Sequence, residues 1–143
     1  MDIPLENPVS HHLGYRLRRA SVTTMTEIAQ ALEEIGLTVA QATILLIIQA
    51  NEGCRQRDIC GELDIQRANM TPLIARLRAL NLIERSAIDG RSQAMRLTPE
   101  GAALAKRAAK TFASHEAWCR RRYTAAELVL LDDLLGRMEV KMV

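Results

Sequence analysis

The sequence predicts a mainly α-helical fold with a small two-stranded β-ribbon, in a single domain spanning residues 1–143. Through most of the chain, apolar residues recur every three or four positions, which is the spacing of amphipathic helices. Only one stretch, near residues 82–97, has the composition of two strands around an Asp-Gly pair. A hydrophobic content of 48% with 25% charged residues is ordinary for a globular domain of this size.

The first predicted helix is long and the second is buried. Asn7-Pro8 can cap and start the first helix, and its apolar residues repeat as far as Ile35, before Gly36. The second begins at Thr38, where TVAQ has the form of a capping box. Its run ATILLII predicts burial over most of the helix circumference, and Asn51-Glu52-Gly53 ends it.

Two short helices joined by a tight turn follow, which is the helix-turn-helix pattern. RQRDICGEL supplies two helical turns, and a brief turn at Asp64-Ile65 leads into QRANMTPLIARLRALN. We expect this second helix to begin near Gln66. Pro72 would then leave the carbonyl of Ala68 without its helical donor and bend the helix. The predicted inward stripe comprises Met70, Leu73, Ile74, Leu77 and Leu80.

The ribbon and two further helices complete the chain. LIERS and QAMRL predict short strands joined by AIDGR, and a ribbon this small must pack on neighbouring helices. Thr98 as N-cap and Pro99 at the first position open a helix that runs to about Arg120. A capping box at TAAE, from Thr124, starts the last helix.

Several classes of protein do not fit the composition. The apolar runs are too short to cross a bilayer and the N-terminus does not resemble a secretory signal, so we expect a cytoplasmic protein without a membrane partner. No glycine-rich phosphate loop, nucleophile elbow or acid–base pair is evident, which predicts that the chain is not an enzyme and has no cofactor. The net charge of +2 conceals local arginine clusters, which are compatible with a polyanion as partner.

The order helix, helix, helix-turn-helix, ribbon, helix, helix is that of a winged helix-turn-helix with additional terminal helices. In LTVAQATILLII, RQRDICGELDIQRANMTPLIARLRALNLIERS and DGRSQAMRLTPEG the sequence resembles the MarR family of bacterial transcription regulators. The resemblance covers nearly the whole chain and is strongest from Leu37 to Gly101. It implies a DNA-binding core at residues 37–101 and dimerisation helices at residues 8–36 and 98–143.

Side chains of the second helix-turn-helix helix can read DNA, because Arg, Asn and Gln match the donors and acceptors of base edges. Gln66, Arg67 and Asn69 are the base-edge candidates, and Thr71 and Arg76 are predicted phosphate contacts. The alternative is a solvated basic helix face, which the arginine-bearing ribbon makes less favoured. The predicted DNA-binding set comprises Arg55, Gln56, Arg57, Gln66, Arg67, Asn69, Thr71, Arg76, Arg85, Asp89, Arg91 and Ser92.

Within the ribbon, Asp89 and Arg91 match the family's Asp-x-Arg. The resemblance implies that Arg91 enters a minor groove, whose negative potential favours a guanidinium, while Asp89 orients neighbouring arginines. Gly90 stands where many relatives carry another basic residue, which predicts fewer phosphate contacts. The alternative for this segment is a plain hairpin turn with solvated charges.

The resemblance also implies a homodimer built from the terminal helices, whose apolar stripes a small winged domain cannot cover alone. A two-fold dimer places its recognition helices about 34–36 Å apart, which fits a pseudo-palindromic operator in double-stranded DNA. The alternative for the last helix is the core of an intrachain bundle. The interface candidates are Leu128, Leu131, Leu135 and Met138.

Family members commonly release DNA when a small aromatic or phenolic anion binds between the dimerisation helices and the DNA-binding domain. The resemblance therefore implies a repressor with an effector of this kind, or with the coenzyme A thioester of such an acid. The start of the first helix brings together cations, hydrogen-bond donors and an aromatic ring; the alternative is that these are surface or dimer contacts. The effector candidates are His11, His12, Tyr15, Arg16 and Arg19.

Three other functions stay open. MTPLIARL resembles the recognition segment of the organic-peroxide-sensing branch, but the first helix has Tyr15 and no cysteine. Cys119, beside Arg120 to Arg122, is therefore the candidate redox thiol, whereas Cys54 and Cys60 are predicted to be buried filler. His115 and Cys119 have a spacing that can seat two zinc ligands, yet no second cluster is evident, so we predict no metal. The alternative from a different class is a winged-helix protein–protein adaptor.

Overall fold

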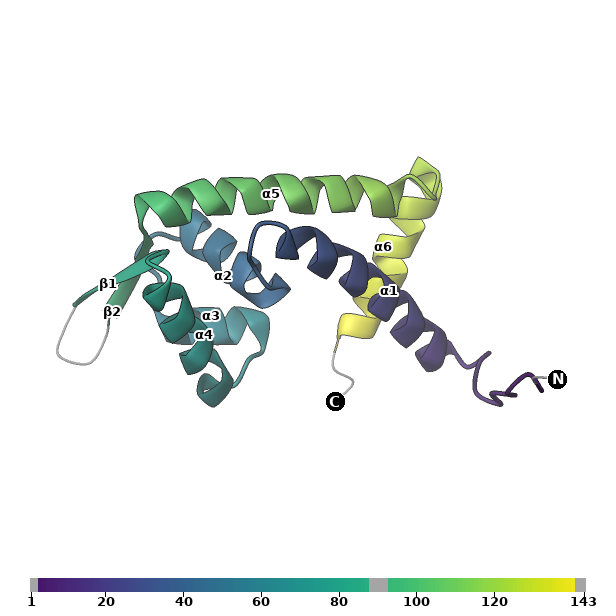
Figure 1. Ribbon diagram of the computed structural model, residues 1–143. Helices are drawn as coiled ribbons and strands as arrows, with labels where there is room; N and C mark the ends of the chain where they lie inside the picture. The colour runs from purple at the N-terminus through teal and green to yellow at the C-terminus, as the bar shows by residue number, and fades with distance from the viewer. Residues whose placement is uncertain (1–2, 88–92, 141–143) are drawn as a thin grey trace.

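The computed structural model describes residues 3–87 and 93–140, which form six helices and one two-stranded antiparallel ribbon (Figure 1). The predicted class, mainly helical with a small β-wing, is confirmed. The elements in chain order are α1 (Leu13–Glu33), α2 (Val39–Ala50), α3 (Gln56–Leu63), α4 (Arg67–Ala79), β1 (Ile83–Ala87), β2 (Gln93–Leu97), α5 (Pro99–Arg120) and α6 (Ala125–Glu139).

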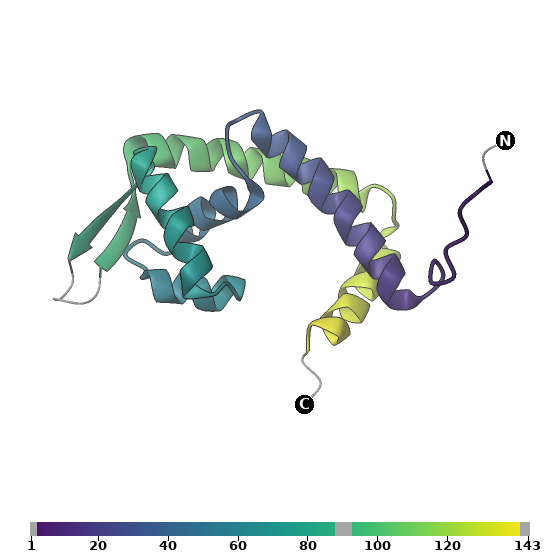
Figure 2. The same ribbon diagram turned by 60° about the horizontal axis from the view of Figure 1, so that its bottom comes forward.

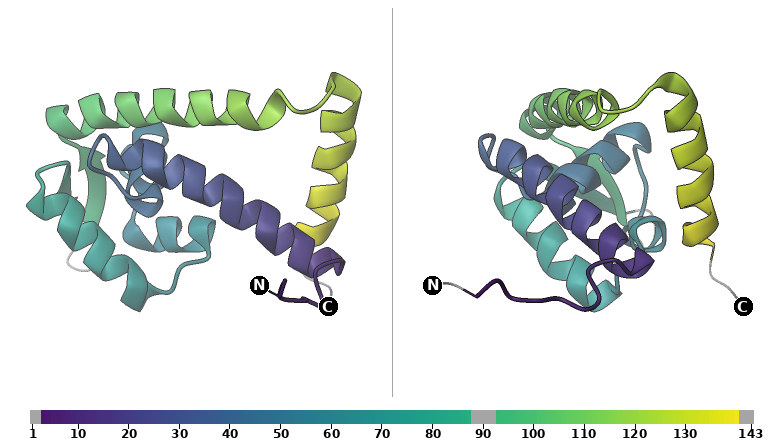
Figure 3. Two further views of the ribbon diagram at one scale, coloured as in Figure 1. Left: turned by 45° about the vertical axis from the view of Figure 1, so that its right-hand side comes forward. Right: turned by 90° about the vertical axis from the view of Figure 1, so that its right-hand side faces the viewer.

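Helix α5 runs along the length of the molecule, and different elements lie at its two ends (Figures 1 and 2). At one end lie the ribbon and the α3–α4 pair, and at the other α6 turns away from α5. Figure 3 shows that α6 stands apart from the winged part of the molecule. None of the helices in the described residues is long and apolar enough to span a membrane.

The hydrophobic core is centred on α2, which packs against α1, α4, α5 and β2. Ile44 and Leu45 are fully buried, and no residue of α2 before Gln49 is exposed. The predicted capping box is present, since Thr38 Oγ1 accepts from the Gln41 amide at 3.2 Å and Gln41 Oε1 accepts from the Thr38 amide at 3.0 Å. The sequence prediction of a helix buried on most sides is confirmed.

Helix α1 begins later than expected. The Asn7 side chain does accept from the Val9 amide at 3.1 Å, but the chain then makes only a turn through His12, and the helix starts at Leu13 rather than at Pro8. A single helical turn needs packing to persist, and Val9 is 43% exposed. At the other end the helix stops at Glu33, and Gly36 makes the turn into α2 at φ +78°.

The helix-turn-helix forms as predicted. Asp64 adopts a left-handed conformation, φ +50°, between α3 and α4, and Gln66 is the N-cap of α4. The helix continues through Pro72, so the expected start near Gln66 is confirmed. The inward stripe is confirmed except for Leu80, which is 39% exposed because the chain leaves the helix there. The expected bend at Pro72 stays a prediction.

The ribbon packs into the domain instead of standing alone. Strands β1 and β2 pair with Arg85 opposite Met95, and the buried Met95 also exchanges two backbone hydrogen bonds of 2.9 Å with Gly53 and Cys54. The other edge of β2 is thereby covered by the segment between α2 and α3. This arrangement satisfies the expectation that so small a ribbon needs neighbours.

The junction between the ribbon and α5 is tightly built around Thr98. Its hydroxyl donates to the Asn81 carbonyl at 2.6 Å and accepts from the Gly101 amide at 3.0 Å, while its own amide donates to the Leu82 carbonyl. Gly101 lies directly against the Leu82 carbonyl, where no Cβ atom fits. The predicted N-cap at Thr98 is confirmed, and it fixes the wing relative to α5.

Candidate functional site

The polar side chains of α4 are presented to solvent at one end of the molecule. Met70, Ile74 and Leu77 are fully buried, which leaves the opposite face of the helix free. Figure 2 shows this helix and the ribbon side by side at the end of the molecule away from α6. The exposed set on α4 and its N-cap comprises Gln66, Arg67, Asn69, Thr71 and Arg76, as the sequence predicted.

A chain of hydrogen bonds joins α3, α4 and the ribbon. Gln56 is its centre: its side-chain amide donates to Thr71 Oγ1 at 3.1 Å, and its Oε1 accepts from an Arg85 guanidinium nitrogen at 2.9 Å. Thr71 donates in turn to the Arg67 carbonyl at 3.0 Å, within the first turn of α4. Three residues predicted as separate DNA contacts are therefore bonded to one another.

Arg85 differs from an ordinary surface arginine. It is half-buried in β1, and desolvation by this burial, followed by repulsion from Arg78, lowers its pKa from the usual value. Its second guanidinium nitrogen lies 3.4 Å from Gln93 Oε1 on β2. An arginine held by two side-chain acceptors is positioned rather than free, so Arg85 fixes the angle between the ribbon and α3.

Gln93 and Arg78 were missed by the sequence reasoning. The strand register places Gln93 opposite Ala87, on the same face as Arg85 and diagonally across from it. Diagonal cross-strand neighbours are within reach of long side chains, but a two-residue turn at Asp-Gly would pair Gln93 with Ser86, so the sequence held no signal for the observed pair. Arg78 lies exposed near the end of α4 and adds positive charge beside Arg85.

The two arginines that flank Gln56 have an acidic neighbour. The Arg55 amide donates to Asp58 Oδ2 at 2.8 Å, and the exposed Arg57 lies 3.8 Å from Asp58 Oδ1. At this exposure the ion pair contributes little to stability, and Arg57 remains available to a phosphate. Asp89, Arg91 and Ser92, which the sequence predicted to contact DNA, lie outside the described residues, and their roles stay predictions.

Much of the apolar surface of helix α6 is exposed. None of its residues is buried, so the alternative of an intrachain bundle core is not supported in the described chain. Of the interface candidates, Leu128 and Leu131 are half-buried, whereas Leu135 and Met138 are 41% and 61% exposed. The sequence reasoning left out Val129 and Leu130, which are also exposed.

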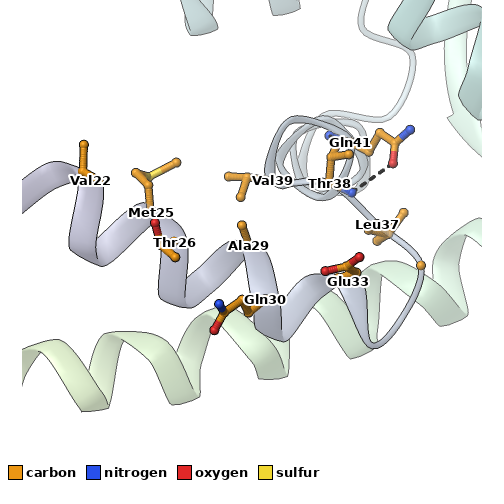
Figure 4. A pocket seen from close by; sticks show the side chains of 11 residues that line it. Val22, Met25, Thr26, Ala29, Gln30, Glu33, Leu37, Thr38, Val39 and Gln41 are labelled. Carbon is orange, nitrogen blue, oxygen red and sulfur yellow. Dashed lines mark hydrogen bonds between the residues drawn. The ribbon is translucent and has the colours of Figure 1, made fainter.

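A pocket of about 720 Å³ lies between α1 and the start of α2 (Figure 4). None of the predicted effector residues His11, His12, Tyr15, Arg16 and Arg19 lines it. His11 lies in the turn before α1, and His12 is the N-cap. The lining residues are Val22, Met25, Thr26, Ala29, Gln30, Glu33, Gly36, Leu37, Thr38, Val39 and Gln41.

His115 and Cys119 do meet on α5, as their spacing predicted. Cys119 Sγ lies 3.8 Å and 4.0 Å from the two ring nitrogens, and His115 Nε2 lies 2.9 Å from the Thr24 carbonyl oxygen of α1. Because a carbonyl only accepts, Nε2 carries the proton, and the ring serves to join α5 to α1. Among the described residues no third ligand joins the pair to make a metal site.

Cys54 and Cys60 both pack against the core, but they are half-buried and not fully buried as predicted. Burial, with a contribution from Asp58, raises the pKa of the Cys54 thiol above its ordinary value.

Comparison with known proteins identifies this architecture. Residues 35–92 match the family model described as MarR family. The structure of the transcriptional repressor CouR bound to a 23-mer DNA duplex superposes with a TM-score of 0.86 at 30% sequence identity, covering 96% of this chain and 100% of that one. The chain belongs to the MarR family.

Other MarR-family relatives agree along most of the length. CouR bound to p-coumaroyl-CoA gives a TM-score of 0.86 at 27% identity, over 97% of this chain and 100% of that one. The HTH-type transcriptional repressor Rv2887 of Mycobacterium tuberculosis is 28% identical over 117 residues, which are 80% of this chain and 84% of the relative. Its complex with salicylic acid has a TM-score of 0.69 at 26% identity, covering 96% and 97% of the two chains.

Proposed function

We propose that this MarR-family protein is a transcriptional repressor that binds double-stranded DNA as a homodimer and is released by a small aromatic effector. The observation that carries the proposal is the presentation of Gln66, Arg67 and Asn69 at the free start of α4, in a chain of which 96% superposes on a repressor in complex with DNA. The major groove admits an α-helix, and these side chains have donors and acceptors for base edges.

The other residues of the predicted DNA-binding set have different roles. The half-buried Arg55 and the exposed Arg57 and Arg76 contact phosphates, which sets the register of the protein on the duplex without reading sequence. Gln56, Thr71 and Arg85 hold the ribbon and α4 at a fixed angle, because they are bonded to one another. On the family pattern alone, Arg91 is the proposed minor-groove contact, Asp89 orients neighbouring arginines, and Ser92 is a further DNA-binding residue.

Dimerisation follows from the uncovered apolar faces of the terminal helices. Helix α6 exposes Leu135 and Met138, and α1 exposes Leu13, Val22 and Met25. Contiguous apolar surface of this kind is rarely left bare in a soluble protein. We propose residues 37–101 as the DNA-binding core and residues 8–36 and 98–143 as the dimerisation helices, with two α4 helices about 34–36 Å apart on a pseudo-palindromic operator.

Two observations support the proposed effector: the ligands bound to related repressors, and the side chains at the start of α1. CouR and Rv2887 are described with p-coumaroyl-CoA and salicylic acid, which supports an aromatic acid or its coenzyme A thioester as effector class. The exposed residues His11, His12, Arg16 and Arg19, with the half-buried Tyr15, are the proposed partners of its anionic part. An effector releases DNA only if it binds the dimer geometry that does not fit the operator more tightly.

An electrophoretic shift assay tests the function. A duplex carrying the region upstream of the protein's own gene should be retarded, and salicylate or p-coumaroyl-CoA should reverse the shift. Arg16→Ala should retain DNA binding and need more effector for release. If the protein retards neither the upstream duplex nor any other genomic duplex, the repressor function is overturned and the protein–protein adaptor is favoured.

A thiol-based sensor is the second candidate, because Cys119 lies within 4.0 Å of the His115 ring at the contact between α5 and α1. Oxidation there would disturb the joint between two dimerisation helices. Peroxide should then release DNA from the wild-type protein and not from Cys119→Ser. Equal release from both proteins would eliminate this candidate.

A further inference from the structure

Three side chains are stacked at the end of α5, where the chain turns into α6. The Trp118 ring lies 5.6 Å, centroid to centroid, from the His115 ring at an interplanar angle of 22°. The guanidinium carbon of Arg122 lies 3.8 Å from the centroid of the Trp118 ring. A cation at this distance is attracted by the electrons of the aromatic face. Trp118 is therefore in contact with a ring on its own helix and with a cation that lies beyond the end of the helix.

Hydrogen bonds tie this stack to the backbone on both sides. His115 Nε2 donates to the Thr24 carbonyl of α1 at 2.9 Å. A guanidinium nitrogen of Arg122 donates to the Trp118 carbonyl at 2.7 Å. The last four carbonyls of a helix have no helical donor, so this bond satisfies one of the free carbonyls of α5. The contacts thus run from α1, through the end of α5, to the segment that leads into α6.

The direction of α6 depends on this corner. None of the described residues of α6 is buried, and no other described element packs extensively against it. Figure 3 shows that α6 leaves the end of α5 at a steep angle. Residues 121–124 join the two helices, and within this segment Arg122 bonds its side chain back to α5. The contacts that hold Arg122 therefore also hold the direction of α6.

We infer that Trp118 and Arg122 are positioning residues that fix the angle between α5 and α6, and that this angle sets the distance between the two recognition helices of the dimer. The inference rests on the proposed function in taking α6 as part of the dimer contact. Because α5 is one continuous helix from the ribbon to the corner, a change of angle at the corner displaces α4 at the other end (Figure 1). The stack then decides which spacing of half-sites the dimer accepts.

Arg122→Ala tests the inference, with Arg121→Ala, the exposed arginine directly before it, as the matched control. The two probes are the upstream duplex and a derivative with two base pairs inserted at the centre of the protected segment, which moves the half-sites apart by about 7 Å. The wild type and Arg121→Ala should prefer the original duplex about a hundredfold, because the longer duplex prevents both copies from binding at once. Arg122→Ala should stay dimeric in sedimentation and lose most of this preference.

A distance measurement without DNA separates the inference from the repressor function. A spin label on Ala75→Cys, on the exposed side of α4, reports the separation of the two α4 helices in a dimer whose three natural cysteines are replaced by serine. The distance distribution should be narrow with the stack intact and broader or shifted in Arg122→Ala. Arg122→Lys keeps a cation and a donor and should restore it. The emission of Trp118, the only tryptophan, reports directly whether the stack is present.

An unchanged distance distribution or an unchanged duplex preference in Arg122→Ala would overturn the inference. So would a monomeric Arg122→Ala protein, because the arginine would then be a contact between copies. Trp118→Leu removes the ring and keeps an apolar side chain, so it should reproduce the effect of Arg122→Ala, and wild-type behaviour of this variant would also overturn the inference. Circular dichroism establishes that the variants fold. A broadened distance distribution in a protein that binds no duplex would overturn the repressor function and leave the positioning role standing.

Discussion

Arg85 and Gln56 are joined by a 2.9 Å hydrogen bond that connects the first strand of the ribbon to the first residue of α3. The same glutamine reaches Thr71 on α4, so one side chain holds the three parts of the DNA-facing end together. Its contribution to DNA binding should be through position, without contact to phosphate.

Gln56→Ala should weaken operator binding about tenfold, because it removes the link between the ribbon and α4 and leaves the half-buried Arg85 with only the 3.4 Å contact to Gln93. The dependence of log affinity on log salt should keep its slope, since no phosphate contact is lost. Arg76→Ala should instead lower the magnitude of that slope by about one. Fluorescence anisotropy at several salt concentrations measures both, with Gln49→Ala, an exposed glutamine of α2, as control. A reduced slope in Gln56→Ala would contradict the positioning role.

Arg67→Ala should reduce affinity for the operator by about 1–3 kcal/mol and affinity for a shuffled duplex by much less, because a base-edge contact is lost. The control is Arg107→Ala, an exposed arginine of α5. A uniform loss on both duplexes would make Arg67 a phosphate contact.

Leu135→Asp combined with Met138→Asp should convert the dimer into a monomer, because two charges then occupy an apolar contact. Sedimentation velocity measures the mass, and operator affinity should fall with it, since a monomer reaches one half-site. Asp132→Asn on the same helix is the matched control. A variant pair that stays dimeric would show that α6 is not the interface.

Gly101→Ala should destabilise the fold by about 3 kcal/mol, because its methyl group would meet the Leu82 carbonyl and neither backbone segment can move without losing the Thr98 bonds. Gly61→Ala, at an open helical position in α3, should be neutral or stabilise by about 0.5–1 kcal/mol. Thermal unfolding measures the stability of both variants. A Gly101→Ala protein as stable as the wild type would contradict the tight junction between the ribbon and α5.

Cys54 should react slowly with iodoacetamide. Burial raises its thiol pKa above 9.0, so at a given pH less of it is the reactive thiolate. Because the pKa of the Cys54 thiol is higher in the folded protein than in the unfolded chain, the protonated thiol favours the folded state at neutral pH. This contribution to the free energy of unfolding is lost as the pH rises through the pKa of the folded protein. In the Cys60→Ser, Cys119→Ser double variant, the alkylation rate should rise with pH later than for free cysteine. An earlier rise would contradict the burial.

Local signals in the sequence predicted the fold well. The capping residues Thr38, Thr98 and Thr124 all sit where expected, because a cap depends on residues only three positions apart. The cap at Asn7 failed because the turn it starts has no packing partner to extend it into a helix.

The functional end was predicted only in part, because its contacts cross between elements. Arg85 looked like another basic contact, and only the folded chain brings it to Gln56, 29 residues away. The residues that line the pocket offered no signal either, since the pocket exists only where α1 packs beside α2. Composition identified which residues were basic and exposed, whereas the pairing of side chains decides which remain free to bind.

Sequence-specific DNA binding is the central claim, and the affinity ratio between two duplexes tests it most directly. Anisotropy titrations should compare the upstream duplex with a shuffled duplex of the same composition at physiological salt. The account predicts that the upstream duplex binds at least about a thousandfold more tightly and that both affinities fall steeply as salt rises. Equal affinities for the two duplexes, or an affinity that salt does not change, would contradict it.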